Sequence, residues 1–253
     1  MAERFVRVGG VLSYFTRHRT AANLLLVVLI ALGIAAFPRM RAQFFPDVQY
    51  FTTRGYAILQ VNYRGSTGYG RAYMLKLRGG WGKLDREDAV SGAKFLADTG
   101  RADPRRLVIE GGSAGGTTVL QALIHNPGVF RAGVCLFGVS NMFTLASDTH
   151  KFEERYLDTM LGPLPEARDI YRERSAIFFA DKIVDPIIIF QGDIDQVVPR
   201  DQSDTIVESL RKRGIPHEYH VYEGEGHGWR KSETIEHYYE AVERFLRQHV
   251  IFA

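Results

Sequence analysis

The run Gly111-Gly112-Ser113-Ala114-Gly115-Gly116 constrains most strongly how this 253-residue chain can fold. An apolar strand-like run, residues 107–110, precedes it, and a helix-forming stretch, residues 114–125, follows it. The run contains a G-x-S-x-G pattern in the strand–turn–helix context of a nucleophile elbow. Small residues on both sides of Ser113 permit a very tight turn, which would lift its hydroxyl above the carboxyl end of a sheet. A Walker-type phosphate loop is excluded, because no Lys-Ser/Thr pair follows.

The chain after about Val48 alternates strand-like runs with amphipathic helices. Strands are expected at residues 56–63, 107–110, 132–137, 186–190 and 218–222, and helices at 85–99, 114–125, 203–213 and from 232 onward. Residues 140–183 show no strand pattern and are expected to form a helical excursion. This alternation predicts the α/β class, with a mostly parallel sheet that is covered by helices on both faces.

A serine nucleophile needs a base and an acid, and candidates for both follow expected strands. His227 lies between glycines just after residues 218–222, and Asp193 and Asp195 follow residues 186–190. Ser113, Asp195 and His227 then occur in the nucleophile–acid–base order of the α/β-hydrolase fold, with Asp193 as the alternative acid. The backbone N–H of Ala114, at the start of the following helix, is expected to stabilise an oxyanion.

Metal and disulfide chemistry find no support in the sequence. The single cysteine, Cys135, cannot form an internal disulfide and is expected to be a buried small hydrophobe. No cluster of cysteine and histidine has zinc-ligand spacing. We therefore expect neither a metal nor a cofactor at the site.

The amino-terminal segment differs from the rest in composition. Residues 21–37 are apolar except for Asn23 and are bounded by arginines, which favours a single membrane helix over a signal peptide or a core helix. Residues 1–50 hold six of the 32 basic and two of the 29 acidic residues of the chain. The remaining 26 basic and 27 acidic residues nearly balance, so a nucleic-acid-binding face is not expected.

Two resemblances refine these expectations. Residues from about Phe15 to Val48 resemble the amino terminus of resistance–nodulation–division efflux transporters. In that family the segment is the first membrane helix and the start of the periplasmic porter domain. The resemblance implies a membrane anchor at residues 21–37 and a second domain outside the cytoplasmic membrane. That domain would be cytoplasmic if the segment is an artefact. Nothing later in the chain resembles a transporter.

The rest of the chain, residues 49–253, resembles the catalytic domain of the prolyl oligopeptidase family of serine peptidases. The matching segments are residues 49–52, 61–70, Trp81-Gly82 with Asp85 and Asp88, 111–116, 148–153, 191–199 and 223–228. The resemblance implies hydrolysis of short peptides, with Ser113 as nucleophile, His227 as base and the Ala114 amide as an oxyanion donor. The family pattern G-x-x-D-x-x-V-P selects Asp195 over Asp193, and the residues after Asp148 are expected to shape the substrate pocket.

The sequence departs from this family in two ways. No propeller repeat precedes the catalytic segment, and an apolar stretch replaces the His-Gly-Gly-Pro-like loop that would supply a second oxyanion donor. We therefore expect an N-terminally truncated α/β-hydrolase fold at residues 49–253, joined to a membrane-helix segment at residues 1–48. Activity is expected to be reduced, since loss of one oxyanion donor costs on the order of 10²–10³ in rate. An esterase and a catalytically impaired membrane-tethered remnant are the alternatives; the oligomeric state is left open.

Overall fold

The computed structural model describes residues 46–148 and 155–253, together with residues 20, 23, 24, 26–28 and 30. The chain divides into two compact units, residues 1–58 and 59–253. In the first unit the described part includes helix α3 (Pro46–Thr52). Most of the expected membrane segment, residues 21–37, lies outside the described residues. Among the residues that are described, no helix has the length and apolarity needed to cross a membrane.

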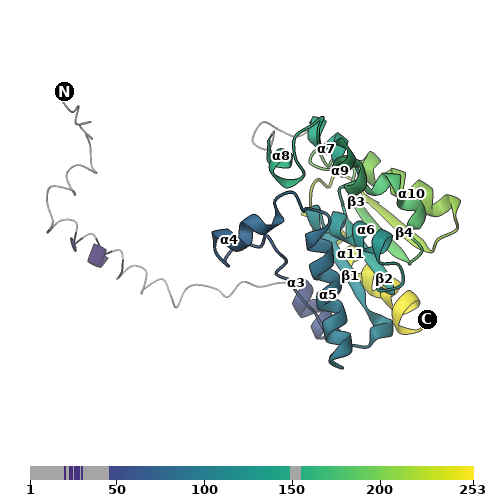
Figure 1. Cartoon of the computed structure of the whole chain (residues 1–253). Coiled ribbons are helices and arrows are strands. Elements are labelled where there is room, and N and C mark those ends of the chain that lie inside the picture. The colour runs from purple at the N-terminus through teal and green to yellow at the C-terminus, as the bar shows by residue number, and fades with distance from the viewer. Residues whose placement is uncertain (1–19, 21–22, 25, 29, 31–45, 149–154) are drawn as a thin grey trace. The chain divides into compact units, whose positions relative to one another are not determined.

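The second unit is built on a four-stranded parallel sheet in the order β1-β2-β3-β4 (Figure 1). The strands are β1 (Val108–Gly112), β2 (Ala132–Leu136), β3 (Ile187–Gly192) and β4 (His217–Tyr222). Their register pairs Ile109 with Gly133, Val134 with Ile188, and Phe190 with His220. Because all four strands are parallel, their carboxyl ends meet at one edge of the sheet.

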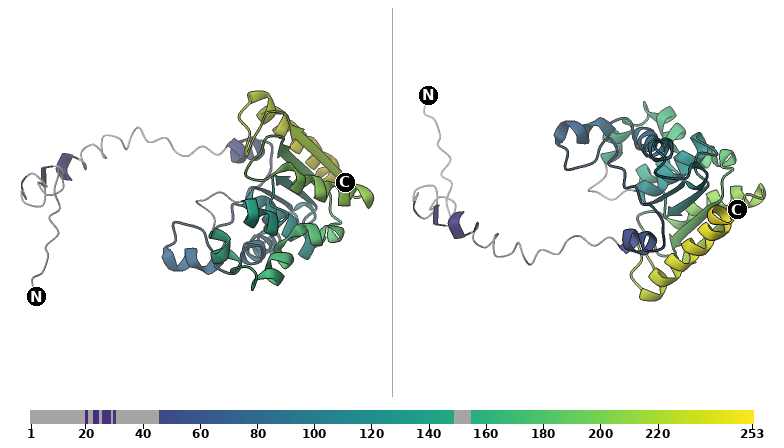
Figure 2. Two further views of the ribbon diagram at one scale, coloured as in Figure 1. Left: turned by 90° about the horizontal axis from the view of Figure 1, so that it is seen from above. Right: turned by 90° about the horizontal axis from the view of Figure 1, so that it is seen from below.

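Helices cover both faces of this sheet. The long ones are α5 (Leu84–Asp98), α6 (Ala114–His125), α10 (Arg200–Lys212) and α11 (Ser232–Leu246), and α11 continues as a π-helical turn (Arg247–Ile251). Ile187 and Ile189 of β3 belong to a core cluster that also holds residues of α6 and α10. Successive side chains of a strand point to opposite faces, and Phe190 contacts Tyr238 of α11, with ring centroids 5.0 Å apart. Figure 2 shows the sheet between α5 and the yellow α11.

The stretch between β2 and β3 is helical, as the sequence predicts. It contains α7 (Met142–Asp148), α8 (Tyr156–Met160), α9 (Arg168–Arg174) and 3-10 turns at Ala176–Phe178 and Ala180–Lys182. These helices have a core cluster of their own, in which Met142, Leu157 and Tyr171 pack with Trp81 and Val198. The excursion is thus a second packed layer beside the main core.

One expected strand is absent. Residues 56–63 are assigned neither strand nor helix, and Ile58 and Leu59 are 42% and 44% exposed. A strand requires a neighbouring ladder for its backbone groups, and in the sheet of the described residues β1 is paired only with β2. The prediction of a strand from the apolar run at residues 56–63 is therefore wrong. Short elements follow it: α4 (Arg71–Met74) and 3-10 turns at Leu75–Leu77 and Pro104–Arg106.

The other expected elements occur within a few residues of their predicted bounds. Helix α5 ends at Asp98 rather than Thr99, and Gly100 follows it with φ 69°, as expected for a C-cap glycine. Helix α6 covers the predicted residues 114–125. Strand β1 and helix α6 carry the G-x-S-x-G turn between them.

Candidate active site

Ser113 lies at the turn between β1 and α6 in a backbone conformation that side-chain-bearing residues rarely adopt. Its φ is 55° and its ψ is −120°. The turn is tight enough to require two of the neighbouring glycines. A Cβ on Gly111 would come 2.5 Å from the Gly115 backbone, and one on Gly116 would come 2.5 Å from Cα of Gly138. Gly115 has open space instead, so packing does not require its glycine.

His227 and Asp195 meet Ser113 at the carboxyl edge of the sheet. Nε2 of His227 lies 2.9 Å from Oγ of Ser113, and Nδ1 lies 2.8 Å from Oδ2 of Asp195. Ser113 follows β1, Asp195 follows β3 and His227 follows β4. His227 is 114 positions from Ser113 and 32 positions from Asp195 along the chain. The structure therefore brings together the serine, the imidazole and the carboxylate that the sequence selects.

The carboxylate of Asp195 is held by backbone as well as by His227. Its Oδ1 accepts hydrogen bonds from the N–H groups of Val197 and Val198 at 2.8 and 2.9 Å. Burial alone would raise the pKa of Asp195. The hydrogen bonds from His227, Val198 and Val197 outweigh that effect and leave the pKa below its ordinary value. Asp195 is therefore a fixed negative charge at neutral pH.

Asp193, the alternative acid, has a different partner. Its Oδ1 accepts a hydrogen bond from the backbone N–H of Gly224 at 2.6 Å. We call residues 192–198 the acid loop and residues 223–231 the base loop. Asp193 thus links the acid loop to the base loop without contacting the imidazole.

Glu225 is a buried carboxylate that the sequence analysis did not single out. It is 1% exposed and accepts hydrogen bonds from the backbone N–H groups of Arg230 and Lys231 at 2.9–3.2 Å. Burial would raise its pKa, but these amides keep the pKa below its ordinary value. The negative charge of Glu225 therefore ties the beginning of the base loop to its end through these hydrogen bonds. An acidic residue between glycines two positions before His227 was the available signal.

The Ala114 amide is the first of α6, directly after Ser113. The first N–H groups of a helix have no acceptor within it, and the helix dipole favours negative charge there. This amide is consequently available to a ligand oxygen beside the Ser113 hydroxyl. Its role as an oxyanion donor stays a prediction of the sequence.

Other reactive side chains lie outside this arrangement. Cys135 is buried, and burial raises the pKa of its thiol to about 12, so it is the inert hydrophobe that the sequence predicts. His220 contacts Glu218, and His237 contacts Tyr222. Residues 149–154, within the segment expected to shape the substrate pocket, lie outside the described residues.

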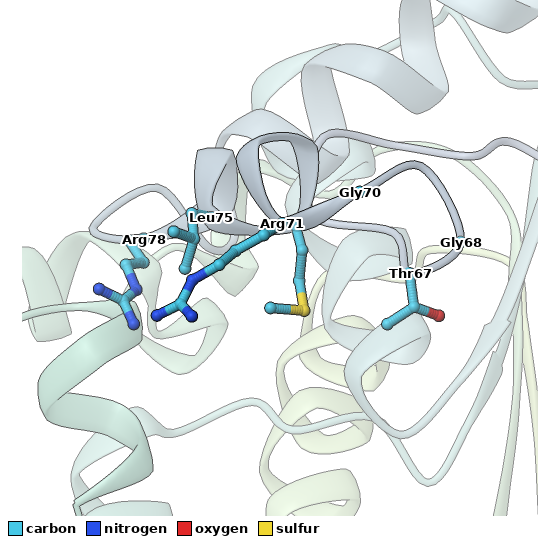
Figure 3. A pocket seen from close by; sticks show the side chains of 7 residues that line it. Thr67, Gly68, Gly70, Arg71, Leu75 and Arg78 are labelled. Atoms are coloured by element: carbon cyan, nitrogen blue, oxygen red, sulfur yellow. The ribbon is translucent and has the colours of Figure 1, made fainter.

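No group of three metal-ligating side chains occurs in the part of the chain that the structure describes. A surface pocket of about 390 Å³ lies at α4, lined in part by Arg71, Met74 and Arg78 (Figure 3). None of the three candidate catalytic residues lines it. The candidate catalytic residues therefore lie at the edge of the sheet and not at this pocket.

Comparisons with known proteins point to the same peptidase family as the sequence motifs. Residues 42–251 match the prolyl oligopeptidase family. Dipeptidyl peptidase family member 6 of Caenorhabditis elegans is 36% identical over 211 residues, covering 81% of this chain and 28% of that protein. Dipeptidyl aminopeptidase BIII of Pseudoxanthomonas mexicana is 34% identical over 205 residues, covering 79% and 30%.

A solved structure of a puromycin-hydrolyzing peptidase of Mycobacterium tuberculosis superposes with a TM-score of 0.77 at 46% identity, covering 79% of this chain and 30% of that one. The chain thus spans less than a third of the length of these relatives. The similarity to efflux transporters over residues 15–48 stays a prediction.

Proposed function

The chain belongs to the prolyl oligopeptidase family, and from this we propose that it is a serine peptidase that hydrolyses short peptides through an acyl-enzyme at Ser113. One observation carries the proposal. The imidazole of His227 lies within hydrogen-bond distance of both the Ser113 hydroxyl and the Asp195 carboxylate. A weakly nucleophilic hydroxyl becomes reactive when an oriented base can accept its proton.

In the proposed first step, Oγ of Ser113 attacks the carbonyl carbon of the scissile bond. The hydroxyl proton moves to Nε2 of His227, and the new negative charge forms on the substrate oxygen beside the Ala114 N–H. Asp195 stays ionised and stabilises the imidazolium through Nδ1. His227 then gives its proton to the leaving amine, the C–N bond breaks, and an ester of Ser113 remains.

Water completes the cycle in the proposed second step. His227 removes a proton from the water as it attacks the ester carbon, and then returns that proton to Oγ of Ser113. The products are an amine and a carboxylic acid. No redox step is involved, so the reaction needs no cofactor. The Ala114 N–H is the oxyanion donor in this proposal, because it is the first amide of α6 and follows Ser113 directly.

A fluorophosphonate probe tests the proposal directly, because it forms a covalent bond only with an activated serine. We expect labelling of the whole chain at Ser113, and loss of labelling in Ser113→Ala and His227→Ala. Ser91→Ala, in helix α5, is the matched control and should label normally. Folded protein that does not label would overturn the proposal.

The substrate class needs a second measurement. Turnover of an aminoacyl anilide, compared with a short-chain ester, separates the peptidase from the esterase alternative. We expect anilide hydrolysis that depends on Ser113. Ester hydrolysis without any anilide hydrolysis would contradict the peptidase proposal while leaving the nucleophile intact.

We also propose that residues 21–37 anchor the chain in a membrane, with residues 49–253 outside the cytoplasm. Supporting this are the uncharged run of residues 24–37 and the arginines at positions 17, 19, 39 and 41 on its two sides. The whole chain should stay in the membrane fraction after alkaline carbonate washing, and Val28→Arg should release it. Retention of Val28→Arg in the membrane, or full solubility of the original chain, would contradict the anchor.

A further inference from the structure

Phe137, which follows β2 directly, has an unusual backbone conformation. Its φ is 36°, and Ser113 and Phe137 are the two non-glycine residues with positive φ among those the structure describes. Such a conformation is unfavourable for a residue with a Cβ and persists where the surroundings enforce it. The turn at Ser113 accounts for one of these two residues. The reaction proposed above gives no role to the other.

The ring of Phe137 lies against the proposed catalytic base. The centroids of the Phe137 and His227 rings are 4.6 Å apart at an interplanar angle of 53°. On another side the ring meets Trp229 edge-on at 5.2 Å, and Trp229 in turn meets Tyr222 at 4.9 Å. Phe137 therefore contacts the imidazole directly, and its own ring packs against Trp229 of the base loop, which packs against Tyr222 of β4.

The neighbouring backbone leaves room for this ring. A Cβ on Gly112 would come 3.1 Å from the ring of Phe137, so a side chain there would press on it. The N–H of Phe137 donates to the carbonyl oxygen of Phe190 at 2.7 Å, which fixes the start of the turn to β3. The ring is thus located by backbone on one side and by aromatic packing on the other.

The two hydrogen bonds of the His227 imidazole do not by themselves prevent every motion of its ring. The N–H and the lone pair of an imidazole lie in the plane of its ring, so hydrogen bonds such as those of His227 to Asp195 and Ser113 resist rocking of the ring out of that plane only weakly. A neighbouring ring packed against the imidazole resists that motion. We propose that Phe137 is a positioning residue that keeps Nε2 of His227 on Oγ of Ser113; this role rests on the peptidase function proposed above.

A purely structural explanation of the same conformation exists. Gly138 and Gly116 approach so closely that a Cβ on either would clash with the backbone of the other. This contact between α6 and the turn after β2 could by itself impose a positive φ at position 137. The two explanations differ in what they require, because the contact needs the φ but not the aromatic ring.

Glycine and tyrosine at position 137 separate the two explanations. Phe137→Gly keeps the φ and removes the ring, whereas Phe137→Tyr keeps the ring. We expect Phe137→Gly to lower kcat about ten- to a hundredfold per labelled serine with little change in KM, because small misplacements of reacting groups cost that much. Phe137→Tyr should restore most of kcat. Phe179→Leu is the control, since Phe179 contacts His125, away from the site.

A spectroscopic measurement keeps the inference separate from the peptidase proposal. With the side chains of histidine isotopically labelled, the proton on Nδ1 of His227 should give one sharp downfield resonance in the original chain and in Phe137→Tyr. In Phe137→Gly it should broaden or split. A sharp unchanged resonance together with full kcat in Phe137→Gly would overturn the positioning role. Lack of turnover in the original chain would overturn the peptidase proposal alone, because the resonance would still report on Phe137.

Discussion

The backbone N–H of Ile194 donates to the carbonyl oxygen of Glu225 at 3.2 Å, and this bond joins the acid loop to the base loop. Asp193 adds a second bond between the loops through the N–H of Gly224. The carboxylate and the imidazole therefore belong to one connected support rather than to two independent loops. We therefore expect substitutions in these two loops to lower catalytic activity more than they lower the stability of the fold.

Gly192 lies where the backbone of the base loop passes close by, with no room for a side chain. A Cβ on Gly192 would overlap the carbonyl oxygens of Glu225 and Gly226. We expect Gly192→Ala to displace the base loop and to lower kcat/KM by about 10–100-fold, with a loss of about 1–3 kcal/mol in the free energy of unfolding. Gly226→Ala, which has open space, should cost less. Equal effects of the two substitutions in steady-state kinetics and urea unfolding would contradict this.

Asp195 and Asp193 should differ sharply when each is replaced by asparagine. In Asp195→Asn an amide replaces the charge beside Nδ1 of His227, so the imidazolium is no longer stabilised and the wrong tautomer is favoured. A loss of about 10⁴ in kcat is expected, by analogy with other triads. In Asp193→Asn the side-chain oxygen can still accept from Gly224, so activity should fall much less. Anilide hydrolysis at saturating substrate measures both, and a reversed order would exclude Asp195 as the acid.

Glu225 should make the stability of the protein depend on pH in a definite direction. Its pKa in the folded protein is below the ordinary value, so its contribution is fully present above the unfolded pKa. That contribution is lost as the pH falls through the folded pKa. Glu225→Gln should therefore lower the free energy of unfolding by about 1–3 kcal/mol at pH 7, since it leaves buried amides poorly satisfied. The difference from the original chain should shrink below about pH 4.

Urea unfolding at several pH values measures this difference. Glu208→Gln is the control, because Glu208 is exposed and pairs with Lys212 one helical turn away. Its effect should be small at every pH. A difference for Glu225→Gln that stays constant from pH 7 down to acid would show that the carboxylate charge does not support the base loop.

Local sequence patterns were enough to predict the elements that carry the site. The strands β1 to β4 and the helix after Ser113 follow from apolar runs and from the strand–turn–helix context of Gly111–Gly116. The same reasoning failed at residues 56–63, because an apolar run specifies burial or pairing but not whether a partner strand is present. The order Ser113, Asp195, His227 identified residues that the structure brings together.

The support around these residues could not be predicted in the same way. The contact of Phe137 with His227 depends on the packing of segments that are far apart in sequence. The burial of Glu225 depends on how the base loop folds back on itself, which periodicity does not reveal. The choice of Asp195 over Asp193 came from a family pattern, since either carboxylate follows β3 closely enough. Only the loop geometry gives Asp193 its separate partner, Gly224.

Ser113 itself should carry a stability cost that glycine can relieve. Its φ of 55° is unfavourable for any residue with a Cβ. Replacement of alanine by glycine normally destabilises a folded chain by about 0.5–1 kcal/mol, because glycine gains freedom in the unfolded state. At position 113 the relief of about 1–3 kcal/mol of strain should offset that penalty. Ser113→Gly should therefore be at least as stable as Ser113→Ala in thermal unfolding, while both lack activity. Clearly lower stability of Ser113→Gly would show that the turn stores no strain.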